Sequence, residues 1–153
     1  MKFAAYVSQS TPVVNAANNN INLMGVSAIR ATVQESTFGG YASSSTPMET
    51  AWQRTSTAGT TPPAAANVVR LDQTLTSSLG NTMLVYANAS WATGPAKAAG
   101  ALFGAAWNAY GGVVRWLAAP GEEWDLCLTT NGIVCAAVAG TGTSSYHCIW
   151  TEF

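Results

Sequence analysis

Short runs of apolar residues, each ended after a few positions by glycine, proline, asparagine or serine, recur along the whole chain. The clearest example is the stretch 111–125, in which residues 113–117 are mostly β-branched or aromatic. Such residues favour a strand, and the Pro120-Gly121 pair that follows is a strong turn signal. Because Trp124 then opens another apolar run, this stretch predicts a strand, a turn and the start of a second strand.

Other segments carry the same kind of pattern. In residues 29–34, apolar and polar side chains alternate, which is typical of a strand that is buried on one face. Several short strands separated by turn residues, without a sustained helical period, are typical of a β-sandwich or a β-barrel. The other expected strands are residues 2–8, 49–55, 68–71, 82–90 and 145–153.

Residues 95–110 leave two interpretations open. Pro95 followed by many alanines is compatible with the first turn of a helix. Gly100 and Gly104 argue against a helix, because each costs about 1 kcal/mol relative to alanine inside one. We therefore favour a strand through residues 102–107 that ends at the turn-like Asn-Ala-Tyr-Gly-Gly sequence.

The stretch 124–138 predicts a β-hairpin with Thr130-Asn131-Gly132 at its tip. A two-residue loop would place Cys127 and Cys135 on opposite faces, whereas a three-residue loop with a glycine bulge would pair them across the strands. We favour the second register, because it gathers the apolar residues of both strands on one face. That register allows a disulfide between Cys127 and Cys135 on the outer face but does not require one.

Together, these elements predict one all-β domain, a single antiparallel β-sandwich of jelly-roll-like form. A chain of 153 residues has an ordinary length for one domain with a single core. The asparagine-rich run 15–20 predicts a loop. We therefore expect residues 1–20 to form an extended N-terminal arm and residues 21–153 to form the sandwich domain.

The low charge of the chain changes the functional picture. Only 8% of the residues are charged, against roughly 25% in a typical globular protein. A protein packed against neighbours needs fewer surface charges than one that is alone in solution, so the composition favours a homo-oligomer or a larger assembly. A net charge of −1 does not provide the basic surface of a nucleic-acid-binding protein.

Hydropathy argues against a membrane partner and against export. No apolar run approaches the length of a membrane span, and the first apolar run is too short for a secretory signal peptide. We therefore expect no membrane partner and no Sec-type export.

No combination of residues predicts catalysis, a cofactor or a metal. The single histidine, His147, has no motif around it that would complete a hydrolytic triad. Glu122 and Glu123 are adjacent on a turn, so their carboxylates diverge and cannot flank one glycosidic bond. The three cysteines lack the paired spacing of a zinc site, and buried positions are common for free cysteine. We therefore expect no enzymatic activity.

Aromatic residues are the remaining candidates for recognition. Trp91 and Tyr41 lie beside turn-rich sequence, and we expect them to be the exposed recognition residues. Five tryptophans fall in expected strands and are predicted to pack in the core, namely Trp52, Trp107, Trp116, Trp124 and Trp150.

Two motifs resemble segments of a known group of proteins. Residues 51–60 read Ala-Trp-Gln-Arg-Thr-Ser-Thr-Ala-Gly-Thr, and residues 113–123 read Val-Val-Arg-Trp-Leu-Ala-Ala-Pro-Gly-Glu-Glu. Over roughly residues 25–153 the chain resembles small virion structural proteins of tailed bacteriophages. The resemblance implies a jelly-roll-like β-sandwich that coats or reinforces a particle, and it implies no active site.

The resulting hypothesis is a virion structural protein, a capsid decoration or cement subunit that is assembled in the host cytoplasm. Its expected partners are other virion proteins and copies of itself. The alternative is a carbohydrate- or receptor-binding β-sandwich module with exposed aromatic residues.

Overall fold

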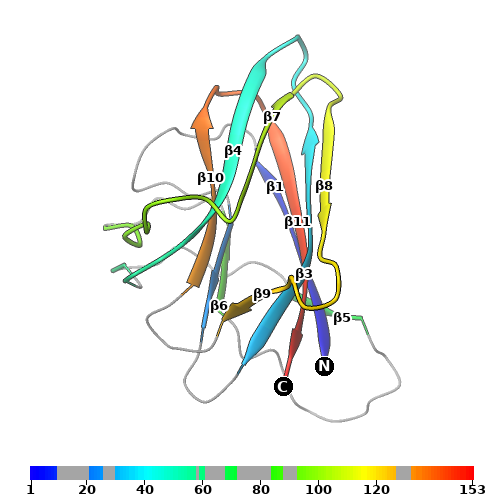
Figure 1. Cartoon of the computed structure of the whole chain (residues 1–153). Helices are drawn as coiled ribbons and strands as arrows, with labels where there is room; N and C mark the ends of the chain where they lie inside the picture. Colours follow the sequence, from blue (N-terminus) through cyan, green and yellow to red (C-terminus); the bar gives the residue numbers. More distant parts are fainter. Residues whose placement is uncertain are drawn as a thin grey trace.

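The computed structural model describes residues 1–9, 21–25, 30–57, 59–60, 68–71, 84–87, 93–126 and 132–153. In this part of the chain every paired strand runs antiparallel to its neighbour, and the strands form two packed sheets without a helix (Figure 1). The prediction of an all-β, antiparallel β-sandwich is therefore confirmed.

Each sheet combines strands from the beginning, the middle and the end of the chain. The first sheet, sheet A, has the order β5-β1-β11-β3-β8, with β9 also paired to β3, and the second, sheet B, has the order β6-β2-β10-β4-β7. The strands of sheet A are β1 (Lys2–Gln9), β3 (Ala31–Gly40), β5 (Val68–Arg70), β8 (Val113–Leu117), β9 (Trp124–Leu126) and β11 (Ser144–Glu152). The strands of sheet B are β2 (Ile21–Met24), β4 (Pro47–Arg54), β6 (Leu84–Ala87), β7 (Phe103–Asn108) and β10 (Gly132–Ala139).

The strand pairs are nested in the sequence. β1 pairs with β11, β2 with β10, β3 with β8 and β4 with β7, so early strands meet late ones in reverse order. This arrangement brings the β3–β4, β7–β8 and β10–β11 loops to one end of the sandwich and both chain ends to the other (Figure 1).

The core lies between the sheets, and strand alternation explains which side chains fill it. In β11, buried Tyr146, Cys148 and Trp150 alternate with half-buried residues. All five strand tryptophans contact the core as predicted, since Trp107 and Trp116 pack against its fully buried members. Burial of such large rings contributes much of the stability of a domain this size.

Core tryptophans connect the strands through one ring contact and one hydrogen bond. The rings of Trp116 and Trp124 stack with their centroids 3.8 Å apart. The indole N–H of Trp52, on β4, donates a hydrogen bond of 2.6 Å to Ser36 Oγ on β3, which links the two sheets through the core. The predicted strand, turn and strand in residues 111–125 are therefore present, and Trp116 and Trp124 both point inward.

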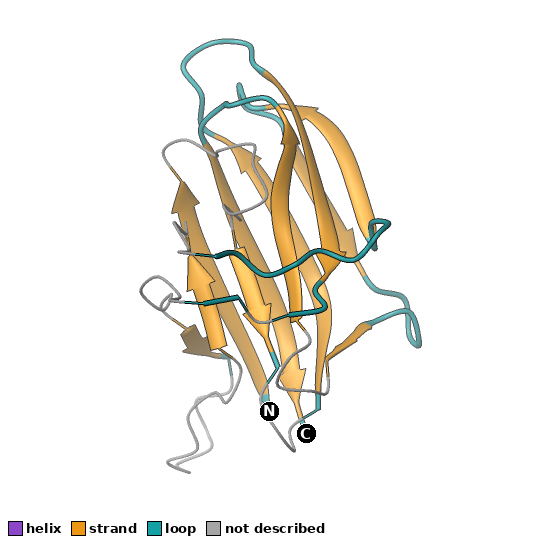
Figure 2. Ribbon diagram, turned by 90° about the vertical axis from the view of Figure 1, so that its left-hand side faces the viewer, coloured by secondary structure: helices purple, strands orange, loops and turns teal. Residues whose placement is uncertain are grey.

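Residues 95–110 contain a strand, β7, and no helix, because its partly buried and exposed side chains alternate and pair it with β4. The preceding residues 93–102 lie on the sheet B side of the sandwich (Figure 2), where Ala98 and Leu102 donate backbone hydrogen bonds to β4. β3 continues to Gly40, beyond the expected strand 29–34, because Phe38 is fully buried and pairs with Tyr146.

The predicted hairpin over residues 124–138 is wrong. β9 pairs with β3 in sheet A, whereas β10 lies between β2 and β4 in sheet B. Both segments have an apolar face, but the two faces meet across the core rather than lying side by side in one sheet. Residues 127–131, which include Cys127 and most of the expected tip, lie outside the described residues.

The expected boundary of the N-terminal arm also needs correction. Residues 2–9 form β1, which lies between β11 and β5 inside sheet A. Phe3, Ala5 and Val7 alternate toward the core, so burial rather than an extended arm fixes this segment. The remainder of the proposed arm, residues 10–20, lies outside the described residues.

The expected position of Cys135 differs as well. Cys135 is a free thiol that faces the core instead of the outer face, and Cys148 is a second buried free thiol. The disulfide allowed between Cys127 and Cys135 is therefore not formed in this structure. Burial raises the pKa of Cys148 to about 12, and burial with the nearby Cys148 raises the pKa of Cys135 well above its usual range.

Thiol labelling provides a direct check of these positions. In a Cys127→Ser variant, we expect Cys135 and Cys148 to resist an alkylating reagent at pH 8 in the folded protein and to react fully in denaturant. The reactive thiolate is disfavoured at both sites, and labelling would require opening of the core. Mass spectrometry after timed labelling measures the result, and rapid modification of either cysteine in the native state would contradict the assigned burial.

Candidate functional site

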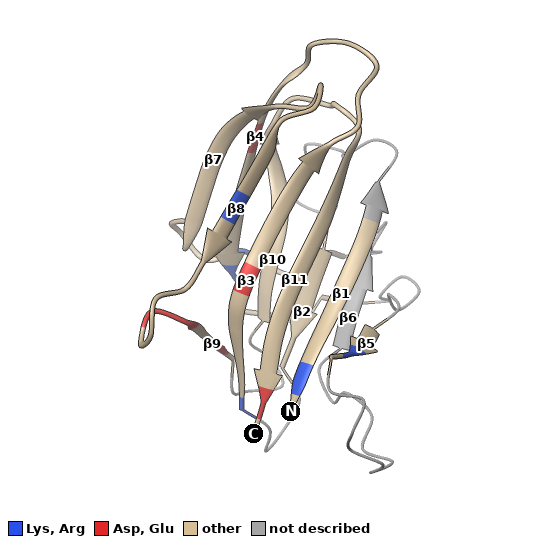
Figure 3. Ribbon diagram, turned by 90° about the vertical axis from the view of Figure 1, so that its right-hand side faces the viewer, with Lys and Arg blue, Asp and Glu red and all other residues tan. Residues whose placement is uncertain are grey.

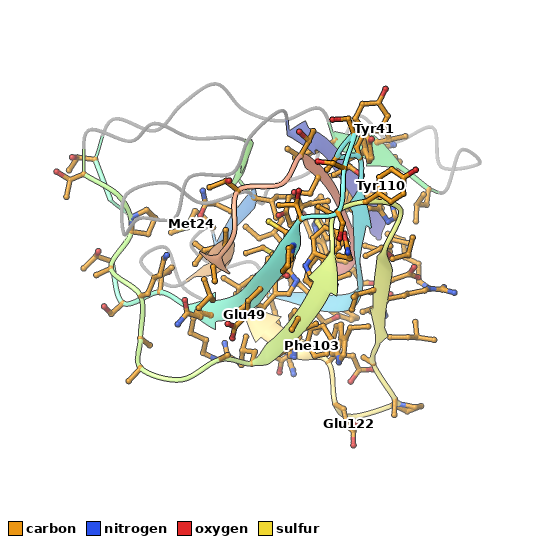
Figure 4. The ribbon with its side chains drawn as sticks, turned by 90° about the horizontal axis from the view of Figure 1, so that it is seen from above. Met24, Tyr41, Glu49, Phe103, Tyr110 and Glu122 are labelled. Atoms are coloured by element: carbon orange, nitrogen blue, oxygen red, sulfur yellow. The ribbon has the colours of Figure 1, made fainter. Side chains whose placement is uncertain are left out.

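Three exposed tyrosines gather at the end of the sandwich that is opposite the chain termini. Tyr41, in the β3–β4 loop, is 81% exposed, and Tyr110, in the β7–β8 loop, is 62% exposed. Both project from neighbouring loops in Figure 4, well apart from Glu122. Tyr6, on β1, is 60% exposed and lines the same hollow as Tyr41. We call Tyr6 together with loops 41–46, 109–112 and 140–143 the tyrosine end.

Backbone hydrogen bonds join the three loops to one another. Tyr41 N donates to Thr143 O at 2.9 Å, and Ala42 N donates to Ala109 O at 2.9 Å. Gly40 is needed for this close approach, because an added Cβ would overlap the carbonyl group of Ala109. Ala109 is itself fully buried, so it anchors the loop that presents Tyr110.

Asn108 further fixes the same loops through its side chain. Its Oδ1 accepts hydrogen bonds from Thr46 N at 3.1 Å and from Tyr110 N at 2.9 Å, while its Nδ2 donates to Ser45 Oγ at 2.7 Å. The tyrosines are thus carried on loops with many internal constraints. A surface ordered before binding loses less conformational entropy on contact with a partner.

The tyrosine end contains a shallow hollow of about 360 Å³. Tyr6 and Tyr41 line it together with Gly39, Gly40 and Ser145. Tyrosine combines a large apolar ring with a polar hydroxyl and has few rotatable bonds, which suits it to recognition surfaces. The hollow therefore offers aromatic contact area and hydroxyl groups to a ligand or a partner chain.

The three loops of this end contain no Lys, Arg, Asp or Glu. They consist of alanine, serine, threonine, glycine and tyrosine. In Figure 3 the loops above β3, β8 and β11 carry no charge colour, whereas charged residues are coloured on strands β3, β4 and β8 and near the chain ends. The two ends of the sandwich therefore differ in chemistry.

The outer face of sheet A carries the Glu35–Arg115 ion pair and the histidine. Arg115 Nε donates to Glu35 Oε1 at 2.8 Å, and Arg115 Nη2 donates to Glu35 Oε2 at 3.0 Å. The hydrogen bond from Arg115 lowers the pKa of Glu35, and the charges of Arg115 and His147 act in the same direction against the opposing effect of burial. His147 pairs with Tyr6 and Thr37 across the sheet.

Acid titration tests the Glu35–Arg115 pair. A lowered pKa in the folded state means that ionised Glu35 stabilises the protein above its unfolded pKa, and that this contribution is lost as the pH falls through the folded pKa. We expect the stability difference between the native protein and Glu35→Gln to shrink as the pH falls from about 6 to about 3. Urea unfolding at several pH values measures it, and a constant difference would contradict this assignment.

The acidic residues considered for catalysis do not meet the histidine. Glu122 is exposed and Glu123 is half-buried at the β8–β9 turn, where Gly121 N donates to Glu123 Oε2 at 2.8 Å. His147 instead lies on β11, within electrostatic reach of Glu35. Among the described residues, no group of three or more histidine, cysteine, aspartate or glutamate residues is arranged to hold a metal ion.

The structure brings one of the two expected recognition residues to the candidate site. Tyr41 lies there, whereas Trp91 lies outside the described residues. Tyr6 and Tyr110 were not predicted from the sequence. Alternation with Phe3, Ala5 and Val7 could have indicated the outward direction of Tyr6, and the turn residues around Tyr110 could have indicated its exposure.

In the described part of the chain, no helix is long and apolar enough to cross a lipid bilayer. Comparison with known proteins finds no matching protein-family model, no matching curated protein and no matching solved structure.

Proposed function

We propose that this chain is a non-catalytic virion structural protein of a tailed bacteriophage, a capsid decoration or cement subunit. It binds the particle surface and neighbouring copies of itself through the tyrosine end. The resemblance of residues 51–60 and 113–123 to phage virion proteins supports the proposal that the assembly is a phage particle.

The observation that carries the proposal is the contrast between the two ends of the sandwich. The tyrosine end is uncharged and held by hydrogen bonds between its loops, and it presents Tyr41 and Tyr110 to the outside. Burying such a surface in a protein contact requires no desolvation of charged groups, and tyrosine is enriched in interface cores. The opposite end carries charged side chains such as Arg30, Glu122 and Asp125, which suit a surface that stays in water.

We further propose that the nested strands constitute a jelly roll. The pairs β1–β11, β2–β10, β3–β8 and β4–β7 are consistent with an antiparallel ribbon wrapped into two sheets. Jelly rolls occur in viral capsid proteins and in lectins. Because one fold serves many functions, this similarity of architecture supports the virion role only by analogy.

Native mass spectrometry of the purified protein over a range of concentrations tests the assembly role. We expect a defined oligomer, and electron microscopy should show it bound to particles where these are present. A stable monomer that binds neither itself nor particles would contradict the proposal.

The second candidate function is a carbohydrate- or receptor-binding module. The exposure of Tyr41 beside the hollow of the tyrosine end favours it. A glycan array with the native protein and Tyr41→Ala separates the two functions at this end. The binding module predicts sugar binding that Tyr41→Ala removes, whereas the assembly role predicts no such binding.

A further inference from the structure

A second hollow lies near the chain termini, at the end opposite the tyrosine end. It has a volume of about 490 Å³, and its lining includes Arg30, Thr32, Gln34, Glu123, Asp125 and Phe153. These residues come from the start of β3, from the β8–β9 turn with β9, and from the C-terminal residue of the chain. Three separate segments thus contribute polar groups to one concave surface.

The contacts within the hollow hold its polar groups in place and still leave some of them available. Arg30 Nη2 donates to Asp125 Oδ2 at 2.5 Å, and Gly121 N donates to Glu123 Oε2 at 2.8 Å. Gln34 Oε1 accepts a hydrogen bond from Thr151 Oγ1 at 3.2 Å, which orients the amide group. Within the described part of the chain, the second carboxylate oxygens of Glu123 and Asp125 and the amide nitrogen of Gln34 remain open for a ligand.

The charges of the hollow are largely balanced. Arg30 neutralises Asp125, and Arg54 donates to the backbone carbonyl of Asp125 at 2.8 Å beside it. Among the lining side chains, the carboxylate of Glu123 is the charged group without an opposite charge as partner, and it would repel an anion. A ligand that offers alternating hydroxyl donors and acceptors would satisfy these groups without carrying a charge of its own.

Phe153 adds an apolar surface to the polar groups. Its side chain is 72% exposed, and its backbone N–H donates to Arg30 O at 2.9 Å, which ties the residue to the edge of the hollow. An aromatic ring beside oriented carboxylate, amide and guanidinium groups matches a sugar, whose ring has apolar C–H faces and a polar rim. Recognition sites commonly combine apolar contact area with a few oriented polar groups in this way.

We propose that this hollow binds a neutral saccharide unit. The open oxygens of Glu123 and Asp125 accept hydrogen bonds from sugar hydroxyl groups, the amide nitrogen of Gln34 donates one, and the Phe153 ring packs against a C–H face. The site uses none of the residues of the tyrosine end, so it is independent of the assembly role.

The test is an NMR titration of the full chain with D-glucose, D-galactose, D-mannose and N-acetyl-D-glucosamine, each raised to about 50 mM because a one-ring site binds on the millimolar scale. N-acetylneuraminic acid serves as an anionic counterpart. We expect at least one neutral sugar to shift the backbone amides of residues 30–34, 121–125 and 153. The absence of such shifts with all four neutral sugars, or shifts with the anionic sugar alone, would overturn the proposal.

Variants locate the binding to this hollow. Gln34→Ala and Phe153→Ala are each expected to weaken the binding about tenfold, the effect of losing one hydrogen bond or a comparable apolar contact. Tyr110→Ala is the matched control, because it removes another exposed aromatic ring at the opposite end and should leave the affinity unchanged. The exposure of Phe153 keeps this test valid if Gln34→Ala fails to fold. Unchanged binding in Phe153→Ala, or equal weakening in Tyr110→Ala, would refute the assigned site.

Discussion

Replacement of Trp52 with alanine is expected to lower the free energy of unfolding by about 4 kcal/mol. The Trp52 side chain is fully buried between the sheets, and its ring lies 5.7 Å from that of Trp124. The substitution leaves a cavity and also removes the hydrogen bond to Ser36 Oγ, which is itself buried. Both effects act in the same direction, because an unsatisfied buried hydroxyl adds to the cost of lost packing.

Chemical denaturation followed by circular dichroism measures this loss. Trp52→Phe serves as the partial control, since it keeps much of the ring volume and should recover more than half of the stability. Tyr41→Ala removes an exposed ring and is expected to change stability by less than about 0.5 kcal/mol. A loss below about 1 kcal/mol in Trp52→Ala would mean that the site is not packed as described.

Gly140→Ala is the second substitution with a large expected effect, a destabilisation of about 3 kcal/mol. Gly140 has a φ of 82°, a conformation that costs energy for a residue with a Cβ. The added Cβ would also overlap the carbonyl oxygen of Pro47 at the start of β4. β10, which ends just before Gly140, and β4, which begins at Pro47, are both paired in sheet B. Neither strand can therefore move away without loss of hydrogen bonds.

Gly121→Ala separates the two causes. Gly121 has a φ of 87°, but a Cβ at this position would meet no atom within 4 Å. This control is expected to lose only about 1 kcal/mol, the cost of the left-handed backbone alone. Thermal or chemical unfolding of both variants gives the comparison, and equal losses would show that the contact with Pro47 contributes nothing.

Strands could be predicted from the sequence where the pattern of apolar and polar residues reflects local burial. β8 ends at Leu117 as expected, and the following Pro120-Gly121 turn is present, because propensity and turn chemistry act over a few residues. The pairing of β9 and β10 could not be predicted in the same way. A hairpin and two facing sheets would both bury the apolar residues of β9 and β10. The outcome depends on whether these two strands pair with each other or with β2, β3 and β4.

Part of the candidate site could be predicted from the sequence for a similar reason. Tyr41 follows two glycines, and this turn sequence indicated its exposure. The gathering of Tyr6, Tyr41 and Tyr110 depends on the nested strand pairs, which bring residues from three distant segments to one end. The hollow beside Phe153 likewise depends on the position of β9 beside β3, which the hairpin prediction excluded.

The central claim is that the tyrosine end is the contact surface of an assembly subunit. Sedimentation velocity of the native protein, Tyr41→Lys and Leu71→Lys over one concentration series tests it most directly. Both substitutions place a charge at an exposed position, but Leu71 lies at the end with the chain termini, where its backbone N–H donates to Lys2 O. We predict that the native protein and Leu71→Lys self-associate alike, whereas Tyr41→Lys associates at least about tenfold more weakly because a charge buried without a partner is costly. A native protein that stays monomeric throughout, or equal association of all three proteins, would contradict the account.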